Sequence, residues 1–184
     1  MKHGNGFMRV DTQEHSHGIA NHAQASSLVA VEDLTQTDTD TLIYMYQEEK
    51  LAMDVYDSLE DQYDLAIFDK ISDAEQVHLS TIESVLVNNG VDISDLQNLD
   101  AGEFANEELQ SLYNTLIEQG STSLEDALNV GVTIENQDIA DLQEYIDSSD
   151  TNVALVGVFS HLETGSEHHL AAFSQALDDS ALLA

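Results

Sequence analysis

A helical stripe of apolar residues that is interrupted by a carboxylate constrains the fold of this chain more than any other feature. From residue 42 onward, large or apolar side chains recur at steps of three and four, which places them on one face of a helix; they are Leu42, Met45, Ala52, Tyr56, Leu59 and Tyr63. Glu49 falls on that same face. An unpaired charge inside a protein is costly, so this carboxylate must be neutralised, hydrogen-bonded or bound to a metal ion. We therefore expect partners for Glu49 on other helices.

Three further segments show a similar interruption. Glu75 and His78 lie three residues apart on the apolar stripe of the segment at 65–89. Glu135 and Asp138 have the same spacing in the segment that begins near residue 124. In the last segment, at 151–177, His169 follows Ser166 by one turn. Because residues three apart lie on the same helix face, each of the four stripes carries polar or ionisable groups near its middle.

The helical periodicity predicts an all-α protein. Four long helices are expected, near residues 39–63, 65–89, 124–147 and 151–177, and one short extra helix near 106–119. The chain contains no proline that would interrupt them. Capping side chains for the first helix are available at Thr37, Asp38, Thr39 and Asp40. We predict a four-helix bundle at residues 39–178, an extended or flexible N-terminal arm at 1–38 and a C-terminal tail at 179–184.

The predicted arm is rich in small and polar residues and has no helical period. Its imidazoles at His15, His17 and His22 suit copper, nickel or zinc, and the alternative is a solvated tail without a site. The apolar run at 27–31 is expected either to pack on the bundle or to add as a strand to a neighbouring copy. The second case would make the arm the contact of a homo-oligomer.

The charge balance restricts the partners of the chain. It has 36 acidic and 4 basic residues among 184, a formal net charge of −32. Such a surface repels nucleic acid and anionic membranes, so we expect neither as a partner, whereas metal ions are attracted. Salt screens the self-repulsion of these charges. We therefore expect a saline setting, extracellular or periplasmic, with a salt-rich cytoplasm as the alternative.

The ligand chemistry available to the chain is oxygen and nitrogen, because it has no cysteine. A dinuclear carboxylate centre in a helical bundle takes one Glu from each of two helices and Glu-x-x-His from each of the other two. The predicted metal ligands are Glu49, Glu75, His78, Glu135 and His169. Asp138 is expected either to be an additional ligand or to accept the hydrogen bond that orients a histidine ring. The acids on outward faces, which include Glu48, Glu83 and Asp54, are expected to be solvated.

Four motifs together carry a family resemblance. They are Gln-Glu-Glu-Lys-Leu-Ala-x-Asp-Val-Tyr at residues 47–56, Glu75-x-x-His78, Ile134-Glu135-x-x-Asp138-Ile139-x-Asp141-Leu142 and Gly165-Ser166-x-x-His169-Leu170-x-Ala172-Phe173. Over residues 39–177 the chain resembles a ferritin-like family of unknown function and, more distantly, rubrerythrin. In rubrerythrin-type sequences the first-helix ligand is a Glu followed by Ala three and Tyr seven residues later, as are Glu49, Ala52 and Tyr56. The resemblance implies a ferritin-like bundle that binds two iron ions, with another divalent metal as the alternative.

The last helix departs from the full ligand pattern. Ser166 stands where Glu-x-x-His would require a glutamate. Glu163 and Glu167 do not substitute for it, because at about 100° per residue they lie well round the helix from His169. The site therefore lacks one bridging carboxylate, which leaves a mononuclear, an asymmetric, a water-completed and an empty site as alternatives.

Two functions from different classes follow from these observations. In the first, the protein is a di-iron oxidoreductase or ferroxidase-like protein in which iron between the helices reacts with oxygen or peroxide. In the second, the bundle is a non-catalytic structural or self-assembling acidic module, outside the cell, that uses its arm for assembly. Iron titration tests the first function, and deletion of the arm followed by light scattering tests the second.

Overall fold

The structure is a computed structural model that describes residue 31, residues 33–148 and residues 151–181. The predicted arm and tail therefore lie mostly outside the described residues, and the histidines of the arm lie wholly outside them. Within these residues the fold is all-helical, with six helices and no strand. The helices are α1 (Gln36–Tyr63), α2 (Ala66–Asn88), α3 (Ser94–Gln97), α4 (Glu107–Gly120), α5 (Leu124–Asp147) and α6 (Val153–Ala181).

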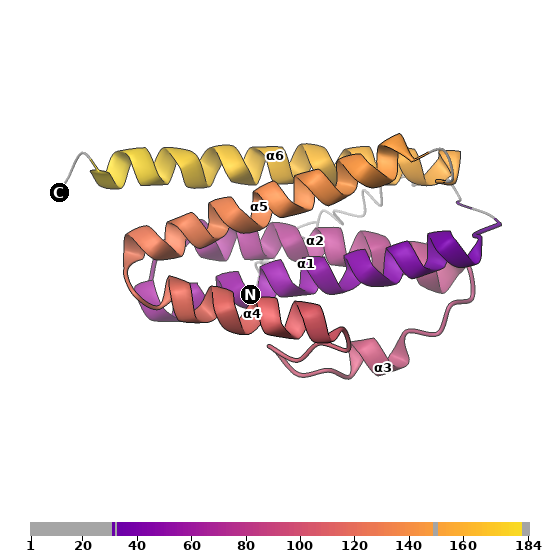
Figure 1. Cartoon of the computed structure of the whole chain (residues 1–184), viewed down its shortest axis with the longest axis horizontal. Coiled ribbons are helices and arrows are strands. Elements are labelled where there is room, and N and C mark those ends of the chain that lie inside the picture. Colours follow the sequence, from indigo (N-terminus) through magenta and orange to yellow (C-terminus); the bar gives the residue numbers. More distant parts are fainter. Residues whose placement is uncertain (1–30, 32, 149–150, 182–184) are drawn as a thin grey trace, which may run out of the picture.

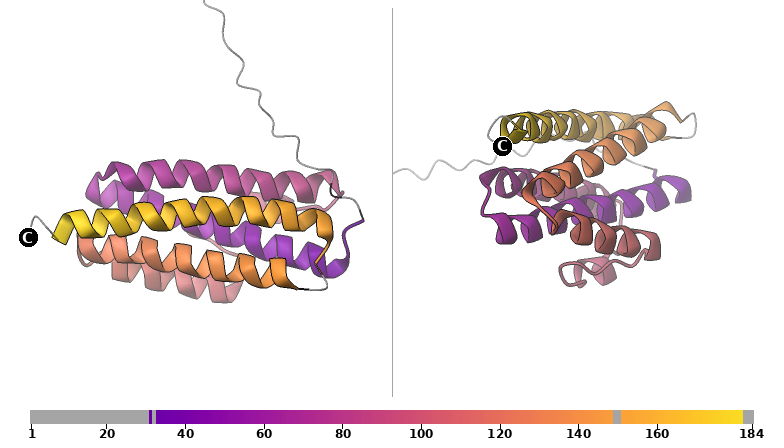
Figure 2. Two further views of the ribbon diagram at one scale, coloured as in Figure 1. Left: turned by 90° about the horizontal axis from the view of Figure 1, so that it is seen from above. Right: turned by 60° about the vertical axis from the view of Figure 1, so that its left-hand side comes forward.

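The four long helices run side by side along the length of the molecule (Figures 1 and 2). Helix α1 packs mainly against α2, and α5 packs mainly against α6. Contacts of α2 with α6 and of α1 with α5 join these two pairs. The chain passes from one pair to the other through a long connection that contains α3 and α4. Helix α4 packs on both α1 and α5, so it covers the seam between the two pairs.

Capping side chains determine where helices α1, α4 and α5 begin. Thr35, rather than the predicted group at residues 37–40, caps α1, and its hydroxyl accepts from the backbone N–H of Asp38 while the Asp38 side chain accepts from Thr35 in return. This reciprocal pair satisfies two N–H groups that the first turn leaves free. At the start of α4 the Asn106 side chain accepts from the backbone N–H groups of Glu108 and Leu109, and at the start of α5 the Ser123 side chain accepts from that of Asp126. The prediction for α1 therefore began too late.

The connection after α2 contains one more helix than the sequence pattern predicted. Gly90 has a φ of +77°, which stops α2 as expected for a glycine in the left-handed region. The segment that follows was predicted as a plain connector, yet α3 forms a single turn within it. A four-residue helix is too short to show a 3.6-residue period, so its sequence carries no detectable signal. The protein therefore has two short helices beside its four long ones.

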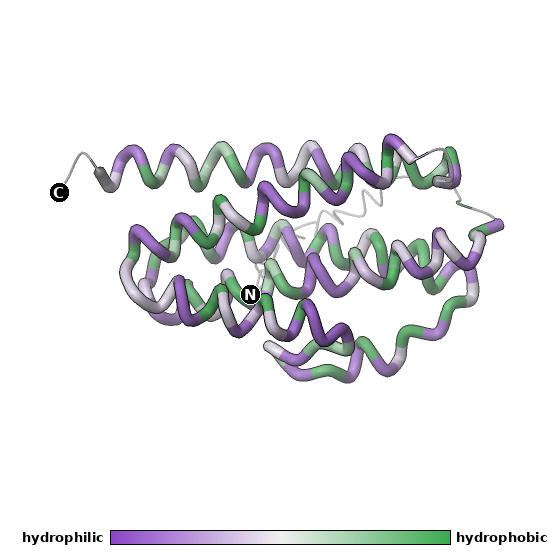
Figure 3. The backbone as a smooth tube through the Cα atoms, in the orientation of Figure 1, coloured by the Kyte–Doolittle hydropathy of each residue, from purple (hydrophilic) through white to green (hydrophobic). Residues whose placement is uncertain are grey.

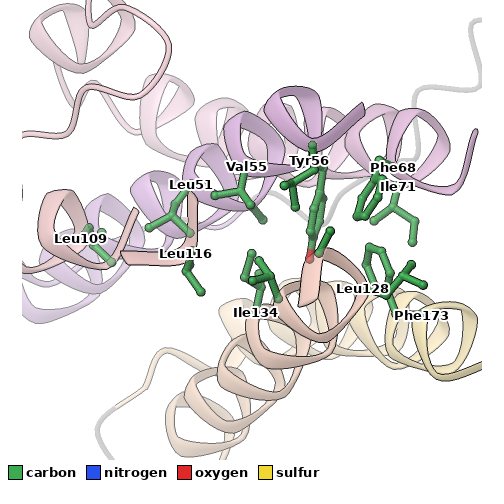
Figure 4. Close-up of a cluster of buried hydrophobic side chains, with 14 of the residues drawn as sticks. Leu51, Val55, Tyr56, Phe68, Ile71, Leu109, Leu116, Leu128, Ile134 and Phe173 are labelled. Atoms are coloured by element: carbon green, nitrogen blue, oxygen red, sulfur yellow. The ribbon is translucent and has the colours of Figure 1, made fainter. Parts of the chain in front are cut away.

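Two apolar clusters form the core, one toward each end of the bundle. One contains Leu51, Val55, Tyr56, Phe68, Leu128 and Phe173 (Figure 4). The other contains Val31, Leu42, Ile82, Leu142, Phe159 and Leu162. The hydropathy of each long helix alternates along its length, as expected for one buried and one solvated face (Figure 3). On all four long helices the polar residues of the predicted site fall between the two clusters.

Val31 is buried at 7% exposure in the second cluster, so the end of the apolar run at 27–31 packs on the bundle. Residues 27–30 lie outside the described residues, and assembly through the arm stays a prediction. Leu124 is apolar but 37% exposed, because it is the first residue of α5 and precedes the packed part of the helix. None of the helices in the described ranges is long and apolar enough to cross a bilayer.

A buried lysine holds the long connection against α1. The ammonium of Lys50 is 2.5 Å from Asp54 Oδ2, donates to the carbonyl of Asp100 at 3.0 Å, and lies 4.8 Å from the centroid of the Phe104 ring. Asp54 also accepts from the backbone N–H of Gly102 at 2.8 Å and is 5% exposed, so the prediction that this acid is solvated is wrong. These contacts tie the loop that leads into α4 to the middle of α1.

We expect Lys50→Met to destabilise the protein by about 2 kcal/mol, because hydrogen bonds to a charged group are lost and Asp54 is left without its cation. Urea unfolding of the metal-free protein measures this change. Lys70→Met on the exposed face of α2 is the control and should change the free energy of unfolding by less than about 0.5 kcal/mol. An equal effect of the two substitutions would show that the Lys50 contacts do not hold the connection.

Candidate metal centre

Five of the six predicted ligand residues meet between the two apolar clusters. Nδ1 of His78 is 2.8 Å from Glu75 Oε2 and 3.3 Å from Glu49 Oε2. Nδ1 of His169 is 2.8 Å from Glu75 Oε1 and 3.5 Å from Glu135 Oε2. The two imidazole rings are 5.4 Å apart, between centroids. Glu75 therefore lies between the two histidines and offers one oxygen to each.

The five side chains are almost closed off from solvent. Glu49 and Glu75 are each 2% exposed and Glu135 is 1% exposed. The side chains of His78 and His169 are 9% and 11% exposed. Although the nitrogen–oxygen contacts are short, Nδ1 of both histidines lacks a hydrogen-bond partner among the described residues, as do one oxygen of Glu49 and one of Glu75. These nitrogen and oxygen atoms converge at one place in the core, which is an arrangement that suits a cation.

The donor atoms fall into two groups that share one residue. Glu49, Glu75 and His78 form the first, and Glu75, Glu135 and His169 form the second, with all donor atoms of each group within 4.8 Å of one another. Each group could hold one metal ion. The structure thus brings together the predicted residues of four different helices, while their role as metal ligands stays a prediction.

Burial and mutual contacts shift the pKa values of this cluster. Burial raises the pKa of Glu49 well above its usual range, and the nearby Asp138 adds to the effect. Burial also raises the pKa of Glu135, to about 8. Burial opposes the charging of His78 and His169, but the carboxylates beside them raise their pKa values to about 11 and about 9. For Glu75, the two histidine contacts outweigh burial and lower its pKa to about 2. Without metal, protons therefore balance the buried carboxylates.

Tyr56 orients one of the carboxylates. Its hydroxyl donates to Glu135 Oε1 at 2.5 Å, from a ring that is fully buried between α1 and α5 (Figure 4). This leaves Glu135 Oε2 as the oxygen that faces His169. The stripe that contains Tyr56 predicted its burial and its need for a partner, but the identity of the partner required the structure.

Asp138 takes a different position from the other five residues. It is not in either donor group, and its carboxylate accepts from Ser166 Oγ at 2.5 Å. Its hydrogen-bond partner is thus a serine, and the two roles expected for Asp138 at a metal site stay predictions. Burial raises the pKa of Asp138 to about 6, and the Ser166 hydrogen bond opposes this rise. Ser166, which is fully buried, thus faces the acid one helix away instead of the cluster.

Gly165 lets His78 occupy its place. A Cβ atom at Gly165 would lie 2.4 Å from Nε2 and 2.7 Å from Cε1 of His78, closer than any real side-chain contact. The ring of His78 therefore packs directly on the backbone of α6. Gly165 belongs to the fourth sequence motif, but its role was not predicted, because a glycine inside a helix gives no sign of which side chain rests on it.

Glu48 also departs from its expected role as a solvated acid. Its Oε2 is buried without a hydrogen-bond partner among the described residues. Burial, together with the charge of Asp141, raises its pKa to about 10. Glu48 lies beside Glu49 in the sequence but not on the apolar stripe, so helical periodicity could not predict its burial. The packing of α5 against α1 covers it.

Comparison with known proteins places the chain in a family. Residues 38–182 match the family described as an uncharacterised protein domain, DUF2202, and the chain belongs to that family. The chain is 37% identical over 146 residues to the uncharacterised protein MJ0754 of Methanocaldococcus jannaschii, covering 79% of this chain and 78% of that protein. It is also similar to the crystal structure of hypothetical protein MJ0754, with a TM-score of 0.75 and 36% identity over 82% of this chain and 85% of that one.

Proposed function

We propose that the protein is a ferritin-like metal-binding protein with a two-ion carboxylate–histidine centre that reacts with oxygen or peroxide. One observation carries the proposal: the two oxygens of Glu75 face two different imidazoles, so two donor groups share a single carboxylate. A carboxylate that bridges two cations has this placement. One ion would be held by Glu49, Glu75 and His78, and the other by Glu75, Glu135 and His169.

The topology supports the ferritin-like part of this proposal. Four long helices form two packed pairs, and a single long connection with α3 and α4 joins one pair to the other. Ferritin-like bundles differ from simple up-and-down bundles by one such long crossover. Their metal sites are also built in the bundle core from side chains on facing helices.

The donor set suits iron better than zinc or calcium. Carboxylate oxygens with one imidazole for each ion are ligands that iron and manganese accept, while structural zinc sites usually include thiolates, which this chain cannot supply. Calcium would favour oxygen ligands alone. Bound iron would supply one-electron redox chemistry. Because the chain has no cysteine, it has no rubredoxin-like donor of its own, and the reductant must be another molecule.

The proposal is tested by an anaerobic titration of the full chain with ferrous iron. We expect two ions per chain, followed by a change in the near-ultraviolet and visible spectrum when oxygen is admitted. Elemental analysis of the protein after dialysis gives the stoichiometry independently. Absence of bound iron and of any spectral change would rule out the iron centre, and one ion per chain would rule out the shared carboxylate.

The affinity for metal is expected to fall as the pH falls. In the metal-free protein the pKa values of His78, His169 and Glu135 are raised to about 11, about 9 and about 8, so all three groups hold protons at pH 7. Metal binding must displace these protons. Each displaced proton weakens apparent binding about tenfold for every pH unit below its pKa. Competition with a chelator at pH 8, 7 and 6 measures the slope, and an affinity independent of pH would contradict the assignment of these ligands.

A further inference from the structure

A pocket of about 80 Å³ opens onto the carboxylates of the candidate metal centre. It lies between α1, α4 and α5. Glu49, Glu75 and Glu135 line it, whereas His78 and His169 do not. The pocket therefore approaches the donor groups from the carboxylate side, opposite the imidazoles. A molecule in the pocket would lie directly beside the oxygens that belong to both donor groups.

Most of the remaining wall of the pocket is apolar, although the carboxylates of Glu48 and Asp138 also line it. Helix α4 contributes Leu109, Leu112 and Leu116, and these residues face Leu51 of α1 and Ile134 of α5. Figure 4 shows Leu109 and Leu116 beside Leu51, with Ile134 on the neighbouring helix. Leu109 and Leu116 are each 2% exposed, while Leu112 is 37% exposed. Because Thr133 and Gln137 are exposed lining residues on α5, the mouth lies between α4 and α5 near Leu112.

We propose that this pocket binds a small, uncharged, apolar molecule of the size of dioxygen and presents it to the metal centre. The occupant's role rests on the proposed function, but its binding to the pocket does not require a metal. Helix α4, which lies outside the four long helices, would thus determine which molecules reach the centre.

Size and charge exclude the other occupants. One water needs about 10–15 Å³ of such a cavity, so the pocket holds a few small molecules and is too narrow for a peptide segment. Anions are disfavoured by the five carboxylates that line it and by the net charge of −32. A strongly polar molecule could hydrogen-bond only with the polar lining residues of α1, α2 and α5, and it would lose its hydration against the leucines of α4 without any such partner. An apolar molecule has no hydrogen bonds with water to lose on entering, and it gains van der Waals contacts with these side chains.

Xenon is a suitable probe, since it is apolar, uncharged and inert toward metals. Amide NMR spectra of the metal-free full-length protein are recorded at increasing xenon pressure. We expect concentration-dependent shifts at Leu109, Leu112, Leu116 and Ile134. We expect them to disappear in Leu116→Phe, which fills the pocket, and in Leu112→Trp, which closes its mouth. Val87→Phe is the matched control, because Val87 is 51% exposed on α2 and does not line the pocket, and its spectra should shift as in the unsubstituted protein.

Shifts that are absent, that occur only away from these residues, or that persist in both pocket variants would overturn the proposal. Circular dichroism shows whether Leu116→Phe still folds, and Leu112→Trp provides the test if it does not, since Leu112 is exposed.

Iron stoichiometry is measured on the same variants. Xenon binding without iron binding would refute the proposed function and leave the pocket site standing. Iron binding without xenon binding would refute the pocket site and leave the proposed function standing. In iron-loaded protein, we expect the pocket variants to raise the KM for dioxygen while two ions remain bound.

Discussion

Glu75→Gln is expected to abolish binding of both metal ions. Glu75 is the single residue shared by the two donor groups, and its two oxygens are each 2.8 Å from a different imidazole. The amide keeps the size of the side chain but removes its charge and turns one oxygen into a nitrogen donor. Since even indirect partners of a metal ligand are worth about 10–100-fold in affinity, we expect losses of at least about 100-fold at each position. Isothermal titration with ferrous iron under anaerobic conditions measures both affinities.

The neighbouring acids provide the controls for this result. Glu49→Gln removes a ligand from one donor group only, so we expect one ion to be lost and the other retained. Glu167→Gln changes an exposed acid of α6 and should leave both ions bound, which excludes a general effect of the surface charge. If Glu75→Gln retains one ion at its original affinity, Glu75 is not shared between two ions and the two-ion centre is wrong.

Gly165→Ala is expected to displace His78 and to destabilise the bundle. The added methyl would lie 2.4 Å from Nε2 of a ring that is held between α1, α2 and α6, so either the ring or helix α6 must move. Overpacking of this kind costs about 1–3 kcal/mol, and we expect the upper end because the obstacle is a buried ring. Metal affinity at the group that contains His78 should fall more than at the group that contains His169. Thermal unfolding and iron titration measure the two effects.

Gly157→Ala is the matched control, because it makes the same substitution in the same helix where a Cβ atom meets nothing within 4 Å. Alanine is the better helix former, so this change should stabilise the protein by about 0.5–1 kcal/mol. Similar effects at the two glycines would show that the space beside His78 is not restricted. The expected difference in sign makes this comparison independent of small errors in either measurement.

The residues of the candidate site could be predicted because they conflict with their surroundings. Glu49 on an apolar stripe and His78 one turn after Glu75 are costly in a core unless they meet partners, and such a conflict is visible in one sequence. Helix periodicity also predicted the four long helices and the short helix α4, and only the single turn of α3 escaped it. The acids and imidazoles lie near the middle of each apolar stripe, so they were expected to meet at the same height in the bundle.

Contacts between helices were beyond prediction for a physical reason. Which oxygen faces which ring, the pairing of Asp138 with Ser166, and the burial of Glu48 depend on the rotation and offset of one helix relative to another. Periodicity along a helix contains no information about that offset, because it shows only which face is inward. The pocket beside α4 likewise depends on the rotation and offset of helices, since it is the space that the side chains of α1, α4 and α5 leave between them.

The sequence by itself therefore determined that this chain forms long amphipathic helices and that their buried faces carry acids and imidazoles at one height. A charged residue on an otherwise apolar helix face is visible in the sequence, and it must find a partner because an unpaired charge is costly in the core. Only the tertiary structure decided that Glu75 stands between the two histidines, that the ring of His78 rests on Gly165, and that an apolar pocket reaches the carboxylates. These features arise from close packing between helices, where the fit of side chains a few ångströms apart selects one arrangement among many that the same helical pattern allows.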